Sequence, residues 1–177
     1  MSEASMHDLA ARLARGEEAA FAELYDACAD RLHHYLAVRL GSHDSASDVL
    51  QATFLRVVKS RKRFRHVENP VAYLFQIARN EAARLGKRRR ANVGPLPFED
   101  LFALAADAGE NADDAEVIAA ALARLSEDDR ELVELKVFVE LTFREIADVM
   151  GMPQGTVATR YRRALESLRP WLEKQMR

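Results

Sequence analysis

Cysteine is nearly absent from the sequence, which has Cys28 alone among its 177 residues. A single thiol cannot form an intrachain disulfide or a CxxC-type zinc or redox site. We therefore expect Cys28 to be a small buried apolar residue. Glycine and proline are also scarce, with 7 and 5 residues, whereas Leu, Ala, Glu and Arg dominate. This composition favours an all-α fold over a β-sandwich or a β-barrel.

Long apolar runs are missing as well. No stretch approaches the roughly 18 apolar residues that a transmembrane helix needs, and no charged-then-apolar leader opens the chain. We therefore expect a cytoplasmic protein without membrane insertion. A hydrophobic content of 49% excludes wholesale disorder, and the length allows one ordinary domain or two small ones.

The net charge of the whole chain is only −2, but the charges are unevenly distributed. Residues 56–90 carry 12 basic and 2 acidic side chains, and residues 141–177 carry 7 and 4. Residues 98–140 between them carry 3 basic and 13 acidic side chains. Two basic blocks indicate two places that could hold a polyanion, although solvated helix faces would produce the same pattern.

Apolar residues at helical spacing predict two helices before residue 60. The first spans residues 21–40 and ends at Gly41, and the second spans residues 44–57. The basic stretch over residues 60–68 lacks this spacing, so we expect it to be a loop.

Asn69 and Pro70 together predict the start of a third helix. An Asn side chain can cap free amides, and proline suits the first helical position. We expect this helix to end at Gly86 and the basic cluster 87–90.

Residues 91–114 lose the helical spacing and carry glycine, proline and several acids, so we expect a flexible linker there. Helical spacing returns over residues 117–125, and Ser126 is typical of a helix start with acids in its first turn. The sequence thus predicts two small helical domains, residues 1–90 and 115–177, joined by this linker.

Residues 141–172 carry the most informative motif. Thr142 and Glu145 form a capping box that begins a short helix, and Gly151 ends it. A further helix follows, with a predicted buried face of Val157, Tyr161, Ala164, Leu165 and Leu168. Its opposite face should present Ala158, Thr159, Arg162, Arg163 and Glu166. This order indicates a helix-turn-helix, which places its second helix in a DNA major groove; a helical hairpin with a solvated basic face is the alternative.

The basic stretch of the first half interleaves cations with aromatic rings. The cations Lys59, Arg61, Lys62, Arg63 and Arg65 surround Phe64, and Tyr73 and Phe75 follow. Such a mixture suits single-stranded nucleic acid, because cations neutralise the backbone and unstacked bases lie against rings. The alternative is that Phe64 anchors a loop and that at least one of Tyr73 and Phe75 lies in the core.

These motifs give the sequence a family resemblance over nearly its whole length. The segments FAELYDACADRLHHYLAVRLG, ASDVLQATFLRVV and AYLFQIARNEA resemble domain 2 of extracytoplasmic-function (ECF) sigma factors of the sigma-70 family. The segment LARLSEDDRELVELKVFVELTFREIADVMGMPQGTVATRYRRAL resembles sigma domain 4. Both motifs in this order are far more specific than a lone helix-turn-helix.

The resemblance implies roles for individual residues. The helix that binds the polymerase clamp is matched by Asp48, Gln51, Phe54 and Leu55. The loop that captures a flipped base of the −10 element is matched by Lys62, Arg63 and Phe64, and Asn80 matches a position that helps to read that element. In the second half, Lys136 matches a phosphate contact, while Thr159, Arg160, Arg162 and Arg163 fall in the segment that meets the −35 element.

The sequence also departs from the family pattern on the polymerase-facing helix. Relatives usually have an acid where Ser47 and Ala52 stand, so this helix is less acidic here. Phosphorylation of Thr53 would restore negative charge.

The resemblance implies a non-enzymatic subunit that directs RNA polymerase to promoters, without cofactor or metal. Its partners would be the core enzyme, through the clamp helices of the largest subunit and the flap, promoter DNA and an anti-sigma factor. Two promoter sites about two helical turns apart lie roughly 70 Å from each other, so free protein should bind promoters poorly. A helix-turn-helix regulator that is no polymerase subunit is the first alternative. A nuclease using His33, His34 and His43 is the second, although no metal or nucleophile motif is present.

Overall fold

The computed structural model describes residues 3–90, 117–118 and 120–175, which form an all-α protein without strands in those ranges. The elements are α1 (Glu3–Arg15), α2 (Glu18–Leu40), α3 (His43–Lys59), the 3-10 helix η1 (Arg61–His66), α4 (Pro70–Arg90), α7 (Glu127–Val137), α8 (Phe143–Met150) and α9 (Gln154–Gln175). The predicted linker, residues 91–114, lies outside the described residues. Among the residues that are described, no helix has the length and apolarity to cross a membrane.

Local capping chemistry explains where several helices begin and end. Gly41 ends α2 in the left-handed conformation at φ 61°, and its N–H donates to the carbonyl of Ala37. The Asn69 side chain accepts from the N–H of Ala72 at 3.0 Å and so caps α4, as the sequence predicted. Ser126 caps α7 in the same way, through the N–H of Asp129 at 3.2 Å.

Three features of the N-terminal bundle, α1 to α4 with η1, differ from the prediction. Helix α1 was not predicted, although Leu9 and Leu13 in it are fully buried. Residues 61–66, expected to be a loop, form η1. Helix α4 continues through Gly86 to Arg90, because a single glycine costs a helix only about 1 kcal/mol and no proline or cap stops it there.

The core of the bundle lies between α2, α3 and α4. Cys28 is buried there among leucines, as predicted, and burial raises the pKa of its thiol. Tyr35 meets Phe75 edge-on at 5.9 Å between ring centroids. Phe75 is fully buried, so at least one of Tyr73 and Phe75 lies in the core, as the alternative to a nucleic-acid role expected.

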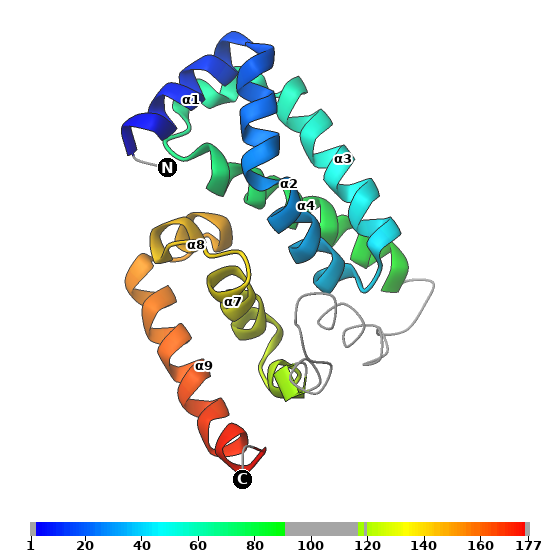
Figure 1. Ribbon diagram of the computed structural model, residues 1–177, viewed down its shortest axis with the longest axis vertical. Coiled ribbons are helices and arrows are strands. Elements are labelled where there is room, and N and C mark those ends of the chain that lie inside the picture. The colour runs from blue at the N-terminus through cyan, green and yellow to red at the C-terminus, as the bar shows by residue number, and fades with distance from the viewer. Residues whose placement is uncertain (1–2, 91–116, 119, 176–177) are drawn as a thin grey trace.

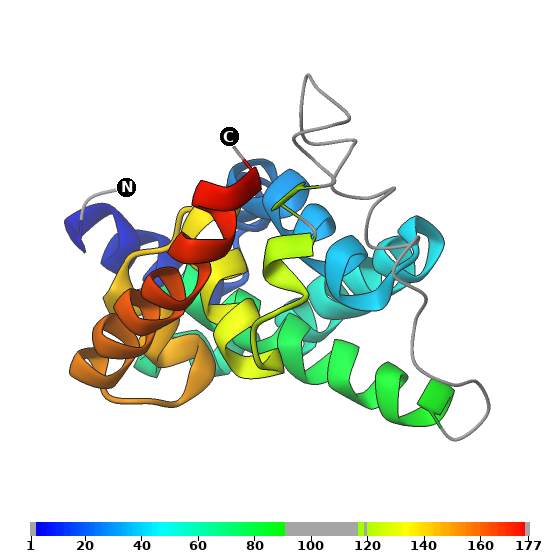
Figure 2. The same ribbon diagram turned by 90° about the horizontal axis from the view of Figure 1, so that it is seen from below.

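The C-terminal helices, α7 to α9, pack against the bundle through α7 and α8. Figures 1 and 2 both show α7 between α9 and the bundle, with α9 on the outer side. One continuous hydrophobic core joins Leu74 and Phe75 of α4 with Leu132 of α7 and Ile146 of α8. The two halves that the sequence predicted as separate domains therefore share buried contacts in this structure.

Candidate nucleic-acid interface

The helix-turn-helix is built from α8, a glycine turn and α9. Both halves of the predicted capping box are formed: Glu145 N–H donates to Thr142 Oγ1 at 3.2 Å, and Thr142 N–H donates to the Glu145 carboxylate at 2.7 Å. Burial opposes ionisation of the Glu145 carboxyl group, but the hydrogen bonds that it accepts from Thr142 and Asn69 hold its pKa below the usual value. Gly151 then turns the chain in the left-handed conformation, at φ 67°. The prediction of this motif from sequence is confirmed.

Helix α9 turns its apolar side toward α7 and α8. Val157, Ala164 and Leu168 are buried. The ring of Tyr161 meets that of Phe143 edge-on, with 5.4 Å between the ring centroids. The prediction that Leu165 is buried was wrong, since it is 41% exposed. Leu165 follows the buried Val157 by eight residues, which turn a helix about 80° beyond two full turns. Its side chain therefore points away from the buried face.

The outward side of α9 carries the predicted reading residues. Thr159, Arg162 and Arg163 are exposed on neighbouring turns of one face. Within the described ranges, neither Arg162 nor Arg163 forms an ion pair or hydrogen bond, so both guanidinium groups are available to a polyanion. Five donors in a planar fork suit both guanine edges and phosphates.

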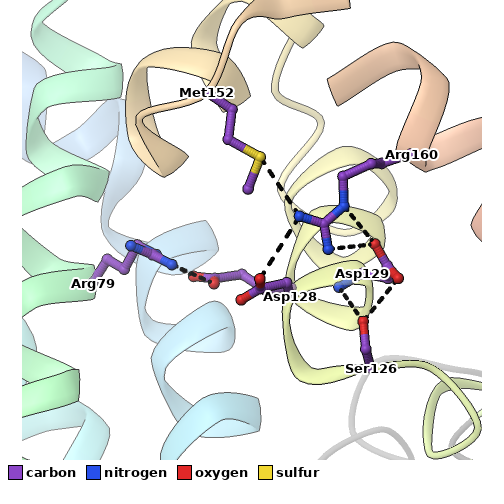
Figure 3. A network of polar contacts seen from close by, with 7 residues as sticks. Arg79, Ser126, Asp128, Asp129, Met152 and Arg160 are labelled. Carbon is purple, nitrogen blue, oxygen red and sulfur yellow. Dashed lines mark hydrogen bonds and ion pairs between the residues drawn. The ribbon is translucent and has the colours of Figure 1, made fainter. Parts of the chain in front are cut away.

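Arg160 lies on a different side of α9 from this reading face. Its guanidinium donates from Nε to Asp129 Oδ1 at 2.8 Å, approaches the same carboxylate through Nη2 at 2.7 Å, and lies 3.7 Å from Asp128. Ser126 holds the other oxygen of Asp129 at 2.8 Å. Figure 3 shows Arg160 reaching across to these acids at the start of α7. In this structure Arg160 positions the reading helix.

We expect Arg160→Met to destabilise the protein by about 1–2 kcal/mol, because it removes a charge-assisted pair that is only partly exposed. Urea denaturation of Arg160→Met, Asp129→Asn and the double variant should give a coupling energy of about 1 kcal/mol. Arg163→Met is the matched control and should leave stability unchanged. Normal stability together with lost DNA affinity in Arg160→Met would instead make Arg160 a direct DNA contact.

Lys136 is also engaged within the protein. Its ammonium donates to the carbonyl of Leu141 at 3.0 Å and lies 5.3 Å from the centre of the Phe143 ring. It thereby ties the end of α7 to the start of α8, next to the helix-turn-helix. A phosphate contact by Lys136 stays a prediction.

A basic pocket of about 710 Å³ opens between α3, η1 and α4. Its charged lining residues are Arg56, Lys59, Arg63, Glu81 and Arg84. The polar and aromatic ones include Asn80, Gln76 and Tyr73. Four cations and one carboxylate give the pocket an excess of positive charge. A pocket of this size, with an aromatic ring and an amide, suits a nucleotide.

The pocket contains only part of the set that the sequence predicted. Arg63 and Asn80 line it, whereas Lys62 is exposed outside the lining. Arg56, Gln76 and Arg84 were missed. Helical spacing was the available signal, because residues 76, 80 and 84 share one face of α4, and residue 56 lies one turn before Lys59 on α3.

The ring of Phe64 is not at the surface in this structure, as the loop-anchor alternative expected, and its role at the −10 element stays a prediction. It is 1% exposed and meets Tyr73 edge-on at 5.3 Å between centroids. It is the one apolar residue in the RKRFRH sequence of η1, so this turn directs it inward. In this structure Phe64 is the anchor of the segment, and the half-buried Tyr73 is the ring that lines the pocket.

Part of the positive charge in the pocket is already paired. Glu81 accepts from Arg56 and, at 3.2 Å, from Arg84. Lys59 and Arg63 form no such pair in the described part of the chain. These two cations are therefore the most accessible to an incoming phosphate.

Helix α3 presents the residues expected to bind polymerase on its outer surface. Asp48, Gln51 and Leu55 are exposed, and Leu55 is 54% so. Phe54 is half-buried and packs on Tyr25 with 4.9 Å between ring centroids. Tyr25, which is also exposed, extends this surface onto α2 and was missed by the sequence analysis.

Thr53 faces the opposite way, into the core. Its hydroxyl donates to the carbonyl of Val49 at 2.7 Å, and its side chain is fully buried. Phosphorylation of Thr53 is therefore incompatible with this fold.

The three histidines considered as nuclease ligands do not converge. His33 stacks on His43 at 5.6 Å and contacts Ser47, whereas His34 packs near Phe138. In the part of the chain that the structure describes, no three His, Cys, Asp or Glu side chains are arranged to hold a metal ion.

Comparison with known proteins matches both halves of the chain to sigma-70 regions. The family description "Sigma-70 region 2" matches residues 24–92, and "Sigma-70, region 4" matches residues 115–168. RNA polymerase sigma factor CarQ of Myxococcus xanthus is 32% identical over 164 residues, covering 91% of this chain and 94% of the relative. ECF RNA polymerase sigma factor RpoE of Cereibacter sphaeroides is 34% identical over 160 residues, covering 86% of each.

Solved structures give the same result. The sigma factor RpoE bound to the anti-sigma factor NepR, from Bartonella quintana, matches with a TM-score of 0.59 and 26% identity over 80% of this chain and 89% of that chain. CnrH bound to the cytosolic domain of CnrY shares the fold, with a TM-score of 0.71 and 24% identity over 96% and 97% of the two chains. With the helix-turn-helix and the basic pocket in matching regions, this chain belongs to the sigma-70 family and, within it, to the ECF sigma factors.

Proposed function

We propose that this protein is a promoter-specificity subunit of RNA polymerase, which directs the core enzyme to particular promoters and initiates transcription there without catalysing a reaction itself. One observation carries the proposal. A single chain of this family presents two separate cationic surfaces suited to DNA, the outward face of α9 and the pocket beside α4. A regulator that used only its helix-turn-helix would have no use for the second surface.

We assign residues 1–90 to polymerase binding and to recognition and opening of the −10 element. The exposed side of α3, with Asp48, Gln51 and Leu55, fits a partner helix, since it mixes polar and apolar contacts. The pocket at Arg63 and Asn80 fits an unstacked base beside a phosphate.

Residues 115–177 are assigned to the −35 element, with 91–114 as the linker. Thr159, Arg162 and Arg163 suit base edges and phosphates in a major groove. Acids at the start of α7 hold the reading helix through Arg160. The assignment of Lys136 to a phosphate requires its ammonium to leave the Leu141 carbonyl.

An anti-sigma factor is proposed as a further partner. The related RpoE of Bartonella quintana was solved in complex with the anti-sigma factor NepR, and this chain matches 89% of that sigma factor. Copurification of the chain from its host, with and without the inducing condition, would identify such a partner.

The proposal is tested by run-off transcription with core RNA polymerase and a library of genomic promoter fragments. Addition of this protein should produce transcripts with defined start sites, which the core alone does not make. A helix-turn-helix regulator would bind DNA but would not confer initiation on the core enzyme. Absence of both core binding and defined starts would refute the proposal.

Arg162→Ala and Arg163→Ala should each reduce initiation about tenfold, because each removes a cation and a fork of donors from the reading face. Arg169→Ala is the matched control, since Arg169 is exposed on the same helix about two turns further along, and it should leave initiation near the wild-type level. The measurement is run-off transcription at limiting protein concentration. Full activity in both reading-face variants would remove α9 from promoter recognition.

A further inference from the structure

The contact between the two halves centres on one buried carboxylate. Glu131 of α7 is 1% exposed, yet its neighbours in the α7 sequence are mostly charged. Acidic side chains are almost never fully buried unless they are paired. Among the described residues, the side chains that bind the Glu131 carboxylate come from the N-terminal bundle, so its burial depends on the two halves lying together.

Three side chains of the bundle converge on Glu131. Tyr35 Oη donates to its carboxylate at 2.7 Å, and Arg79 donates to both carboxylate oxygens, at 2.8 and 3.1 Å. Arg39 approaches the carboxylate at 3.2 Å. Burial raises the pKa of Tyr35 well above its ordinary value, so its phenol stays protonated and remains a donor. Figure 3 shows Arg79 extending from α4 toward α7.

Other polar contacts across the interface run in the same direction, from donors in the bundle to acceptors in the C-terminal helices. Arg31 donates to the carbonyl of Val139 at 3.0 Å, and Gln76 donates to the carbonyl of Asp148 at 3.3 Å. Asn69, which caps α4, also donates to the Glu145 carboxylate at 3.0 Å. In these contacts the bundle supplies the donors and the C-terminal helices supply the acceptors.

One contact at the edge of the interface runs the other way. Arg144 of α8 donates to Glu68 of the bundle at 3.1 Å. Both side chains are well exposed, so water screens the pair and it contributes little to closure.

The contact combines these polar groups with the hydrophobic core that joins α4 to α7 and α8. The apolar part favours closure wherever the halves meet, whereas the polar part favours closure only while each buried group keeps its partner. Removal of one partner alone is unfavourable, because it leaves the remaining buried charges unpaired. Glu131 is thus placed to determine whether the halves stay together.

The closed arrangement is too small to span a promoter. The pocket lies on α4, α4 and α8 share one hydrophobic core, and α8 is joined to α9 by the turn at Gly151. The axes of packed neighbouring helices lie only about 8–10 Å apart. The −10 and −35 sites lie roughly 70 Å apart on B-DNA. The two DNA-binding surfaces therefore cannot occupy both sites while α7 and α8 remain packed on α2 and α4.

We propose that the structure is a self-closed resting form, latched by Glu131 against Tyr35, Arg39 and Arg79, and that this latch must open before the protein engages a promoter with RNA polymerase. The inference rests on the proposed function for its biological meaning. The latch itself is a property of the isolated chain, and it can be measured without DNA or polymerase.

The test is a spin-label distance measurement on the full-length chain. Ala22→Cys and Glu166→Cys place labels at exposed sites in the two halves, and the native Cys28 is buried and shielded from labelling. Otherwise unchanged protein should give one dominant, narrow distance distribution. Glu131→Gln should raise the population outside this distribution at least about tenfold, because it leaves Arg39 and Arg79 without their counter-charge.

Two further variants make the result decisive. Arg144→Gln is the matched control, since it breaks an interface pair that is exposed, and its distance distribution should stay closed. Arg79→Gln removes a partner of Glu131 on the bundle side. It should raise the population of open molecules as Glu131→Gln does. Circular dichroism reports whether each variant keeps its helices. A distance distribution in both folded latch variants equal to that of the unchanged chain, or a broad distribution in the unchanged chain, would overturn the proposal.

Run-off transcription separates failure of the latch from failure of the function. At limiting protein, Glu131→Gln should initiate at least as well as the unchanged chain, because less of it is closed. Lower initiation by a folded, opened Glu131→Gln variant would contradict a resting role for the closed form. If neither protein initiates, the proposed function fails, while the distance measurements still decide whether the latch exists.

Discussion

Replacement of Phe64 by alanine is expected to destabilise the protein by about 3–5 kcal/mol, the usual effect of deleting a buried phenylalanine ring. Phe64 is 1% exposed, lies in η1 beneath α1 and meets Tyr73 edge-on. Removal of the ring leaves a cavity next to α1 and α4, and these helices cannot easily move to fill it. Urea denaturation followed by circular dichroism measures the loss, which should appear as a lower midpoint with a nearly unchanged slope.

A matched pair of variants separates packing from base stacking. Phe64→Leu keeps an apolar side chain of similar shape, so it should lose only about 1–2 kcal/mol and retain promoter opening. Tyr73→Leu removes the half-buried ring that lines the pocket, so it should impair opening more than it affects stability. Promoter opening is measured by permanganate reactivity of unpaired thymines. A stable Phe64→Leu variant that cannot open promoters would return Phe64 to the role of a base-stacking residue.

Features set by neighbouring residues were predicted well from the sequence. The Thr142–Glu145 capping box and the Asn69 and Ser126 caps depend on side chains reaching backbone groups within four residues, and the turn at Gly151 depends on its left-handed backbone and its N–H bond to Ala147. Their chemistry is the same in any fold, and for that reason short motifs located the helix-turn-helix correctly.

Features set by distant residues were predicted poorly. The inward turn of Arg160 depends on Asp129, which lies 31 positions earlier, and the burial of Phe64 depends on packing beneath α1. Helix α1 had regular apolar spacing at Met6, Leu9 and Leu13, and this signal was overlooked rather than absent.

The acidic block was the most misleading pattern. Residues 98–140 carry 13 acidic side chains, a count typical of a solvated surface, yet Glu131 and Glu134 are both buried. Burial of Glu131 requires Arg39 and Arg79, which lie 92 and 52 positions away in sequence. Counting charges along a chain cannot pair residues across such separations, so the latch became visible only in the fold.

Glu134 should make the stability of this protein fall as the pH rises toward neutrality. Its side chain is 5% exposed, and burial raises the pKa of its carboxyl group from 4.5 to about 7. Arg39 and Arg130 oppose this change, while Glu131 reinforces it. Over this range the folded state holds a proton that the unfolded state has released, because the folded pKa is the higher one.

The sign of the effect follows from this difference in bound protons. The contribution of Glu134 is fully present below about pH 4.5 and is lost as the pH rises through about 7, at up to about 1.4 kcal/mol per pH unit. The total loss is about 3 kcal/mol. Glu134→Gln should abolish it, because a neutral amide replaces the carboxyl group and has no proton to release.

The measurement is the free energy of unfolding from urea denaturation at pH 5, 6, 7 and 8, compared between the unchanged chain and Glu134→Gln. The difference between the two curves isolates Glu134 from groups that titrate in both proteins. It should move in favour of the glutamine variant by about 3 kcal/mol between pH 5 and pH 8. Glu166→Gln, at an exposed site on α9, should run parallel to the unchanged chain. Parallel curves for Glu134→Gln as well would mean that its carboxyl group is already ionised in the folded protein at pH 5.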